Sequence, residues 1–241
     1  MGADREGDHR RPPEVSGAVT QTEIVTMSDE QLRTKLETLR RLGAATVHEA
    51  MGQRGYVDRA IAPLDPTTRI AGPAYTVDSK PHDNLMMHYA LSKAQPGDII
   101  VVDYKGYTRA AAWGDLMTHS ARAHRIGGLV VDGAVRDAAA IVDMGFPVYC
   151  RGLCITGPTK NQIGRVGVPI NVGGCTVRPG DIVVGDRDGV CIVPFDEIDA
   201  VIRAAEAREQ REAAIIDRLA SGATTVELLG LADVLHDAGL H

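Results

Sequence analysis

The sequence contains little that is typical of secreted, membrane-bound or nucleic-acid-binding proteins. Its 241 residues include only four cysteines, and none of them forms a Cys-x-x-Cys pair, so neither a disulfide framework nor a zinc site is indicated. No stretch approaches the roughly 20 apolar residues of a membrane span, and no apolar signal region opens the sequence. The net charge of −6 gives no sign of a basic surface for nucleic acid. We therefore expect a cytoplasmic protein that binds neither membranes nor nucleic acid.

Aromatic residues are also scarce, at 4%, whereas 44% of the residues are hydrophobic. Small and branched apolar residues suit packed α/β layers, and the predicted elements alternate between helix and strand before strands cluster later in the chain. These patterns predict an α/β fold with mixed sheets flanked by helices. Residues 1–26 are polar and carry a charged run, so we expect a flexible extension there, followed by a single domain over residues 27–241.

The local patterns place the elements. Ser28 and Gln31 form a capping-box pattern that opens a helix ending at Gly43. The sequence further predicts helices at Asp83–Lys93, 114–125, 136–143 and Asp196–Leu219, and strands at Arg69–Val77, Asp98–Val102, Gly128–Val131, Pro147–Cys150 and Val166–Asn171. Gly72-Pro73 favours an edge or bulged position for the first of these strands. Later, Asp186–Gly189 predicts the turn of a hairpin.

One end of a predicted helix is suited to anion binding. Gly114 and Asp115 open this helix, and the free backbone amides of Leu116 and Met117 point out of its N-terminus. Taken alone, Asp115 is more simply explained as a carboxylate that complements the helix dipole, an effect worth up to about 1 kcal/mol. A second charged helix start, further along the chain, makes a functional role more plausible.

Arg136 and Asp137 form this second helix start, after an apolar strand and a predicted turn at Asp132-Gly133. This places them at the carboxyl end of a buried strand, where open α/β sheets bind ligands. A buried arginine beside a buried aspartate indicates an ion-pair network or a functional site. Together with Asp115, the pair predicts a small site for an anionic oxo compound and a divalent metal.

Other polar residues have simpler explanations. Asp103, Lys105 and Arg109 follow a strand and are expected to be solvated loop charges, although a basic loop at the same cleft would also suit a second carboxylate. His88 lies one helical turn after Asn84, and a hydrogen-bonded structural histidine is favoured over a metal ligand. On the long C-terminal helix, alternating glutamates and arginines indicate a salt-bridged, solvated face.

Five blocks, taken together, resemble a known family. They are DNLMMHYAL (83–91), PGDIIVVD (96–103), AAWGDL (111–116), GGLVVDGAVRD (127–137) and GVPINVGG…VRPGDIVVGDRDGVCIVP (167–194). From about Thr46 to Leu229 the chain resembles the regulator of ribonuclease E activity A-like (RraA-like) family, in particular its 4-hydroxy-4-methyl-2-oxoglutarate / 4-carboxy-4-hydroxy-2-oxoadipate aldolases. The resemblance implies a layered β/β/α fold with a long C-terminal helix, and a homotrimer or hexamer with sites between neighbouring subunits.

The resemblance also implies catalytic roles. Asp137 would ligate Mg²⁺ or Mn²⁺, and Asp115 would hold a metal-bound water. Arg136 would contact the oxo group of pyruvate and stabilise the enolate. Glu212 matches a glutamate that reaches into a neighbouring subunit's site, in contrast to the solvated face that its helix pattern indicates.

Substrate-binding roles are implied in the same way. The backbone at Gly114, Leu116 and Met117 would bind the pyruvate carboxylate, and Asn84 would line the site. The segment 156–164 matches no particular substrate, and Lys160 within it is a candidate contact for a distal carboxylate.

The implied activity is retro-aldol cleavage of a 4-hydroxy-2-oxo acid to pyruvate, in the catabolism of aromatic compounds, with oxaloacetate decarboxylation as a side activity. A metal-stabilised enolate explains both reactions. The alternative is a non-enzymatic protein on the same fold that binds and regulates a ribonuclease. A methyltransferase is not favoured, since no glycine-rich cofactor loop follows the first strand.

Overall fold

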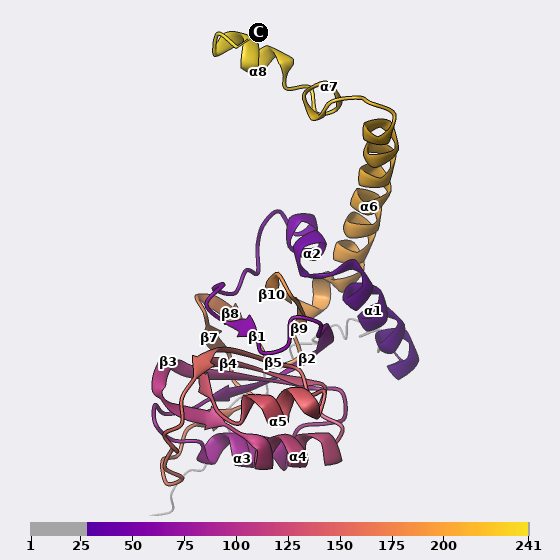
Figure 1. Cartoon of the computed structure of the whole chain (residues 1–241). Helices are drawn as coiled ribbons and strands as arrows, with labels where there is room; N and C mark the ends of the chain where they lie inside the picture. The colour runs from indigo at the N-terminus through magenta and orange to yellow at the C-terminus, as the bar shows by residue number, and fades with distance from the viewer. Residues whose placement is uncertain (1–27, 241) are drawn as a thin grey trace, which may run out of the picture.

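The computed structural model describes residues 28–240. The predicted flexible extension over residues 1–26 lies outside this range. The described chain forms two stacked layers of strands, with three helices on one outer side and the N- and C-terminal helices on the other (Figure 1). The expectation of layered mixed sheets flanked by helices is confirmed. No helix within residues 28–240 is long and apolar enough to cross a membrane.

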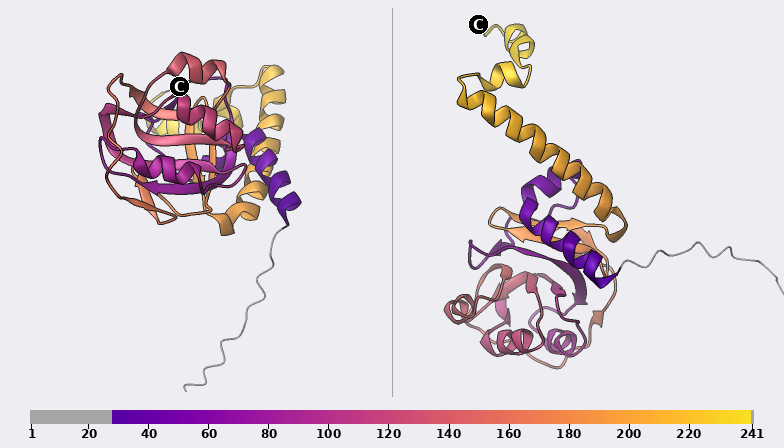
Figure 2. Two further views of the ribbon diagram at one scale, coloured as in Figure 1. Left: turned by 90° about the horizontal axis from the view of Figure 1, so that it is seen from below. Right: turned by 90° about the vertical axis from the view of Figure 1, so that its right-hand side faces the viewer.

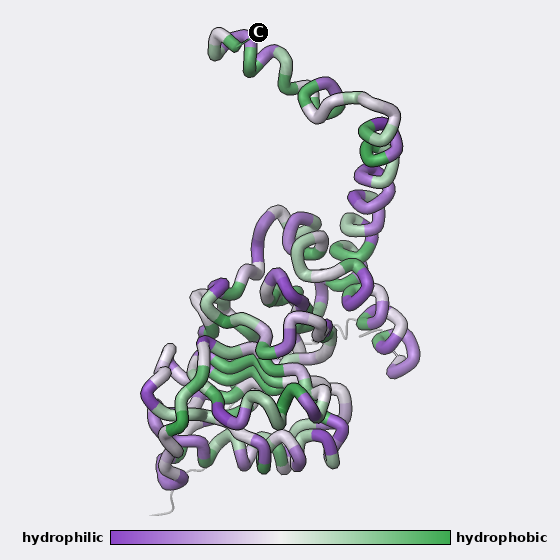
Figure 3. Tube along the Cα trace, in the orientation of Figure 1, coloured by the Kyte–Doolittle hydropathy of each residue, from purple (hydrophilic) through white to green (hydrophobic). Residues whose placement is uncertain are grey.

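The central layer is built from four parallel strands that are neighbours in the order in which they occur in the chain. They are β2 (Ile70–Asp78), β3 (Ile99–Trp113), β4 (Gly128–Val135) and β5 (Val148–Leu153). The connecting helices α3 (Leu85–Leu91), α4 (Asp115–Ala123) and α5 (Ala138–Asp143) cover one face of this layer (Figure 1). Because both faces are covered, the strands form a continuous hydrophobic band (Figure 3). Because the four strands are parallel, their carboxyl ends meet at one edge of the sheet.

Strand β2 belongs to both layers. Its residues 70–73 pair with β9 (Ile182–Asp186), and its residues 74–78 pair with β3. The edge or bulged position predicted from Gly72-Pro73 is not found, because β2 lies inside the sheet and its pairings with β3 and β9 show no shift of register. Pro73 is tolerated there because pairing with β3 starts only at Ala74, so the proline faces a partner on one side alone.

The second layer is made of shorter strands. β9 and β10 (Gly189–Val193) form the hairpin that Asp186–Gly189 predicted. The strand expected at Val166–Asn171 is in fact two, β6 (Arg165–Val166) and β7 (Ile170–Val172), and β7 pairs with β8 (Cys175–Val177). The short β1 (Ala62–Pro63) pairs with β5.

Two predicted breaks in the central strands are wrong. Asp132 and Gly133 lie inside β4 and form no turn, and the loop expected around Lys105 is part of the 15-residue strand β3. Both strands stay paired by shifting register between Val102 and Trp113. The glycine at 133 serves packing, since a Cβ there would lie 2.5 Å from the Tyr104 ring.

The helices α1 (Asp29–Leu42), α2 (Ala44–Ala50) and α6 (Ile198–Ala220) pack on the second layer (Figure 2). The predicted capping box is present: the Gln31 backbone N–H donates to the Ser28 hydroxyl at 3.3 Å, and the Ser28 N–H donates to the Gln31 side chain at 3.0 Å. A short 3₁₀ turn, η1 (Phe195–Glu197), precedes α6. The outer half of α6, with α7 (Thr225–Leu228) and α8 (Ala232–Asp237), projects away from the body as an arm (Figures 1 and 2).

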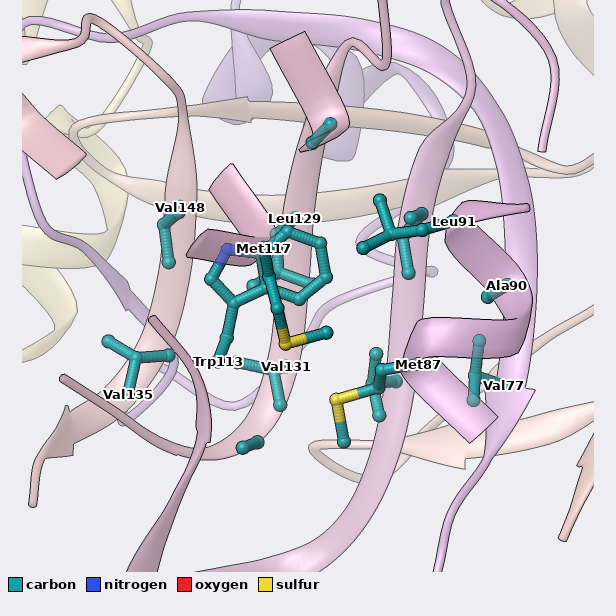
Figure 4. Close-up of a cluster of buried hydrophobic side chains, with 14 of the residues drawn as sticks. Val77, Met87, Ala90, Leu91, Trp113, Met117, Leu129, Val131, Val135 and Val148 are labelled. Carbon is teal, nitrogen blue, oxygen red and sulfur yellow. The ribbon is translucent and has the colours of Figure 1, made fainter. Parts of the chain in front are cut away.

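The core beneath the helical layer fixes the junction between β3 and α4. Trp113, the last residue of β3, stacks on Phe146 with ring centroids 6.2 Å apart (Figure 4 shows the surrounding cluster). Its indole N–H donates to the Thr118 hydroxyl at 2.8 Å. The first residues of α4 are therefore held in place by a fully buried aromatic side chain.

Candidate active site

The polar residues of interest lie where β3 and β4 end side by side. Trp113 pairs with Val135 at the ends of the two strands, and the Arg136 backbone N–H donates to the Trp113 carbonyl at 2.9 Å. Because the strands are parallel neighbours, the residues that come directly after them meet at one sheet edge. The structure thus brings Asp115 together with Arg136 and its chain neighbour.

Asp137 lies directly against the start of α4. Its Oδ2 accepts a hydrogen bond from the Asp115 backbone N–H at 3.2 Å and lies 3.3 Å from Arg136 Nε. Gly114 makes this approach possible, because a Cβ there would lie 2.6 Å from the same carboxylate oxygen. Asp137 itself has φ of +58°, a left-handed conformation that aspartate tolerates better than most residues.

Arg136 and Asp137 are not buried, contrary to the sequence interpretation. Their side chains are 42% and 36% exposed. Strand β4 ends at Val135, so the ion pair of Arg136 and Asp137 lies at the edge of the sheet and not within the core. A ligand therefore reaches both groups without displacing packed side chains.

The amides of the α4 N-terminus are only partly free. The Leu116 N–H donates to the Asp115 Oδ1 of the same turn at 2.7 Å. No residue within 28–240 accepts a hydrogen bond from the Met117 N–H. Of the two amides expected to bind a carboxylate, Met117 is available at once, whereas Leu116 becomes available when the Asp115 side chain turns away.

A cavity of about 130 Å³ opens beside this helix end, well below the volume of a pocket for a drug-sized molecule. It is lined by residues of α3 and β3, by the start of α4, by Arg136 and by the segment after β5: Asn84, His88, Ala111, Trp113, Gly114, Asp115, Leu116, Met117, Arg136, Gly157, Pro158 and Lys160. The sequence-predicted residues Asn84, Gly114, Asp115, Leu116, Met117 and Arg136 are therefore brought together around one small space.

Asn84 stands out among the lining residues because it is only 5% exposed and incompletely bonded. Its side-chain N–H₂ donates to the Ala112 carbonyl at 3.0 Å and to the Met117 sulfur at 3.4 Å. Its Oδ1 has no partner in the described chain. A buried acceptor without a partner is costly, so this amide is suited to a donor that arrives with a ligand or a water.

His88 was not expected in the cavity wall, and the prediction of a hydrogen-bonded structural histidine is wrong. No residue among those described forms a hydrogen bond with its ring. Burial and the nearby charge of Lys160 lower the pKa of His88 below its usual value. The one-turn spacing from Asn84 was visible in the sequence, and it puts both residues in the wall of the cavity.

A second cavity of about 320 Å³ is lined by Arg136 and Asp137. Its remaining walls come from Leu153, Cys154 and Ile155 at the end of β5. Arg136 lines both cavities.

Glu212 does not join this cluster within one chain. It lies in the outer half of α6, on the opposite side of the molecule from the layer that contains α4 (Figure 1). Arg208 holds it at 2.8 Å and also lies 3.6 Å from Glu49. This matches the salt-bridged face indicated by the helix pattern, and a role in a neighbouring subunit stays a prediction.

The basic residue Lys105 also forms ion pairs within the chain. Its ammonium lies 2.7 Å from Asp78 and 2.5 Å from Asp103, and Asp78 further pairs with Arg165 at 2.8 Å. These residues form a charge network on the strands and do not line the cavity beside α4.

The donor set fits a hard divalent cation. Asp115 and Asp137 supply carboxylate oxygens, and no group of three or more His, Cys, Asp or Glu side chains suited to a metal occurs within residues 28–240. Mg²⁺ and Mn²⁺ are bound by one or two carboxylates and keep several waters, whereas a zinc site needs three or four protein ligands. The residues present therefore suit Mg²⁺ or Mn²⁺ and do not suit zinc.

Comparison with known proteins agrees with the fold. Residues 44–192 match the RraA-like family model, described as Aldolase/RraA. A putative 4-hydroxy-4-methyl-2-oxoglutarate aldolase from Halalkalibacterium halodurans is 38% identical over 184 residues, which cover 75% of this chain and 88% of the relative. The chain therefore belongs to the RraA-like family.

Solved structures give the same result. An uncharacterized protein from Pseudomonas syringae pv. tomato superposes with a TM-score of 0.74 at 32% identity, covering 83% of this chain and 94% of that one. Streptomyces coelicolor RraAS2, described as an unusual member of the RNase ES inhibitor RraA protein family, superposes with a TM-score of 0.66 at 28% identity, covering 75% and 94%. A member of the RraA protein family therefore shares this fold.

Proposed function

We propose that this protein cleaves a 4-hydroxy-2-oxo acid in a divalent-metal-dependent retro-aldol reaction that releases pyruvate. The substrate we assign is 4-hydroxy-4-methyl-2-oxoglutarate or 4-carboxy-4-hydroxy-2-oxoadipate. The observation that carries the proposal is the contact of Asp137 Oδ2 with the Asp115 amide at 3.2 Å and with Arg136 Nε at 3.3 Å, beside a small cavity. The likeness to a putative aldolase supports the same assignment.

The reaction makes two demands on the site. The 4-hydroxyl must lose its proton as the C3–C4 bond breaks, and the electron pair left on C3 must be stabilised as the enolate of pyruvate. In the proposal, Arg136 donates hydrogen bonds to the 2-oxo oxygen, where negative charge develops. Asp115 accepts the 4-hydroxyl proton, directly or through a water, and C4 becomes the carbonyl of the second product. The enolate then takes up a proton at C3 by the same route and leaves as pyruvate.

The remaining lining residues orient the substrate. The Met117 amide at the N-terminus of α4 binds the 1-carboxylate, and the Leu116 amide joins it when Asp115 turns towards the substrate. Mg²⁺ or Mn²⁺, when held by Asp137, supplies a Lewis acid that withdraws electrons from the 2-oxo group. Oxaloacetate places the same demand on Arg136, since loss of CO₂ from it leaves the same enolate, so decarboxylation is expected as a side activity.

We also propose that the active form is a homotrimer, or a hexamer made of two stacked trimers. Large exposed apolar side chains form one group beside the site, Leu116, Leu153, Ile155 and Ile163, and another group on the C-terminal arm, Ile216, Leu229, Leu231, Val234 and Leu240. Two different apolar surfaces on one chain favour head-to-tail contacts, which close into rings. In such a ring, the α6 helix of one subunit would bring Glu212 to the site of its neighbour. Light scattering of the purified protein tests this assembly, and a monomer at micromolar concentration would contradict it.

The activity is tested by following pyruvate release from 4-hydroxy-4-methyl-2-oxoglutarate and from oxaloacetate, with Mg²⁺ and with EDTA. The proposal expects release from both that stops on chelation. Release that continues unchanged in EDTA would rule out the metal-dependent mechanism. Release from oxaloacetate alone would retain the enolate-stabilising site but assign a different physiological substrate.

The alternative function is protein binding. The description of Streptomyces coelicolor RraAS2 as an RNase ES inhibitor family member favours a second candidate, a ribonuclease regulator on the same fold. That candidate predicts no pyruvate release from either substrate and a stable complex with a ribonuclease. The Asp115, Arg136 and Asp137 cluster favours the enzyme, since a protein-binding scaffold needs none of it.

A further inference from the structure

We infer that the pocket between α2 and the β9–β10 hairpin binds a small organic amine. Asp188 pairs with the ammonium group of this ligand, and the rings of His48 and Tyr56 contact its apolar part. The pocket lies on the opposite side of the sheets from α4 and the candidate active site (Figure 1). The inference is independent of the proposed reaction and adds a second binding site, with the opposite charge preference.

The size and lining of this pocket suit a molecule with a single ring. Its volume is about 230 Å³, and an engineered protein cavity of about 150 Å³ already binds benzene. Most of the lining residues are small or apolar: Ala44, Ala45, His48, Tyr56, Asp188, Gly189, Val190 and Cys191. None of these described residues is a lysine or an arginine, whereas Arg136 and Lys160 line the cavity beside α4. The two cavities therefore differ in the charge that they favour.

Asp188 provides the negative charge. Its backbone N–H donates to Asp186 Oδ1 at 2.9 Å, but its own carboxylate forms no hydrogen bond or ion pair with any residue between 28 and 240. The residue lies in the tight turn between β9 and β10 and is exposed to solvent. Water weakens its attraction for a cation there, so the charge gives a preference for amines over neutral molecules and not a large affinity.

The His48 ring adds a hydrogen-bond acceptor. Its Nδ1 lies 2.9 Å from the Arg54 carbonyl oxygen, which can only accept a hydrogen bond, so the neutral ring carries its proton on Nδ1. Nε2 is then an acceptor, and it has no partner in the described part of the chain. An ammonium group has three donors, so it can bond this nitrogen and the Asp188 carboxylate together.

Tyr56 supplies an aromatic surface beside this ring. The centroids of the Tyr56 and His48 rings are 6.0 Å apart, and the rings are tilted by 52°. The Tyr56 hydroxyl accepts a hydrogen bond from the Arg59 backbone N–H at 2.9 Å, which fixes the ring in place. Tyrosine rings attract cations within about 6 Å and pack against other rings. An amine attached to a ring uses both properties, whereas a hydrated metal ion uses neither.

The pocket is formed before any ligand binds. Buried Asp186 accepts hydrogen bonds from the Ala44 N–H and the Asp188 N–H, each at 2.9 Å, so one carboxylate joins α2 to the hairpin turn. On β10, Cys191 pairs with Tyr56 as an antiparallel bridge. Both sides of the pocket are therefore held in place, which lowers the entropic cost of binding.

Binding of benzylamine and of benzyl alcohol to the purified protein tests the site. The two molecules have nearly the same size and the same ring, but only benzylamine carries a positive charge at pH 7.5. Calorimetry is expected to show that benzylamine binds about tenfold more tightly. Asp188→Asn should reduce this preference to about twofold and leave the affinity for benzyl alcohol unchanged. The variant is expected to fold, since Asn-Gly is favoured in hairpin turns.

Two further variants locate the binding. Asp143→Asn removes the same charge from an exposed position on α5, outside the pocket, and should leave the preference for benzylamine unchanged. Ala45→Phe places a ring in the pocket from an exposed position on α2, so it should abolish binding of both molecules. An unchanged Tm shows that Ala45→Phe is folded.

The outcomes that would overturn the inference are distinct from those of the pyruvate assay. Equal affinities of the unaltered protein for the two molecules would overturn it, as would a tenfold preference that survives in Asp188→Asn. Binding that persists in folded Ala45→Phe would place the ligand elsewhere.

A last comparison separates a free amine from a lysine of a partner protein. N-acetyl-lysine amide presents an ammonium group from a peptide backbone and has no ring. It should bind at least about fivefold more weakly than benzylamine, because it cannot pack a ring against Tyr56 and His48. Tighter binding of the lysine derivative would assign the pocket to a protein side chain and refute the small-amine ligand.

Discussion

The Asp137 carboxylate lies 3.2 Å from the backbone nitrogen of Asp115, across a gap that only a glycine at position 114 leaves open. The two aspartates come from different strand ends, 22 residues apart. Their contact defines the geometry of the candidate metal site.

Gly114→Ala is expected to reduce pyruvate release about 100-fold. The added methyl would lie 2.6 Å from Asp137 Oδ2, so the carboxylate must move, and a displacement of about 1 Å has this cost in catalysis. The matched control is Gly157→Ala, whose added methyl meets Arg136 Nη1 at an ordinary 3.5 Å and should leave most of the activity. Steady-state rates of both variants check this, and similar losses in the two would contradict it.

Asp137→Asn should lower kcat by at least about 100-fold and abolish stabilisation by Mg²⁺. Asparagine tolerates the left-handed backbone at this position, so the fold is preserved while the negative charge is lost. The rise in Tm on adding Mg²⁺ measures metal binding independently of turnover. Asp143→Asn, at the exposed end of α5, should behave like the unaltered protein. A normal Mg²⁺-dependent rise in Tm for Asp137→Asn would exclude this residue as the ligand.

Asp83→Asn is expected to destabilise the protein by about 2 kcal/mol at pH 7, because an amide group replaces an acceptor of several hydrogen bonds. Burial alone would raise the pKa of Asp83, but the hydrogen bonds that it accepts outweigh burial and hold the pKa below its usual value. The stability that this carboxylate contributes is therefore complete above its unfolded pKa of about 3.9 and is lost as the pH falls through the lower folded value.

Urea unfolding at pH 7 and at pH 3 measures this difference. The gap between the unaltered protein and Asp83→Asn should narrow at the lower pH, whereas exposed Asp233→Asn should show no gap at either pH. A gap that stays constant between the two pH values would mean that ionised Asp83 is not the stabilising form.

Thiol labelling at pH 7.5 should modify one cysteine per chain, Cys154. Burial raises the pKa of Cys150 and Cys175 to about 11 and that of Cys191 to about 12, so these thiols stay protonated and unreactive. Cys154 lines the open cavity next to Arg136, and a bulky label there should also inhibit turnover. Mass spectrometry of the labelled protein identifies the site. Labelling that persists in Cys154→Ser would refute the assignment.

The sequence predicted elements well where a local signal was complete. The capping box at Ser28 and the hairpin turn after Asp186 depend on residues close together in the chain, and both are present. Strand β3 was predicted to end at Val102 but continues to Trp113, because pairing with β4 keeps its polar residues in the strand. That pairing joins distant segments, and periodicity within a short window does not report it.

The order of the strands also made the position of the candidate site predictable. Parallel strands bring their carboxyl ends together, so the proximity of Asp115 to Arg136 follows from element order alone. The exposure of Arg136 and the presence of His88 in the cavity wall depend on side-chain packing that the sequence does not specify. Gly133 shows the same limit, since the sequence indicated a turn there, whereas the structure uses the glycine to make room for the Tyr104 ring.

The contacts between Asp83 and the 159–162 segment join residues 76 to 79 positions apart. Closing so long a stretch of chain is slow, and its entropic cost must be met before the contacts contribute. We therefore expect the contacts between Asp83 and the 159–162 segment to form late in folding, after the sheet between these residues. Because the cavity beside α4 is complete only in the folded protein, a small acid that binds there is expected to protect the protein from unfolding and proteolysis.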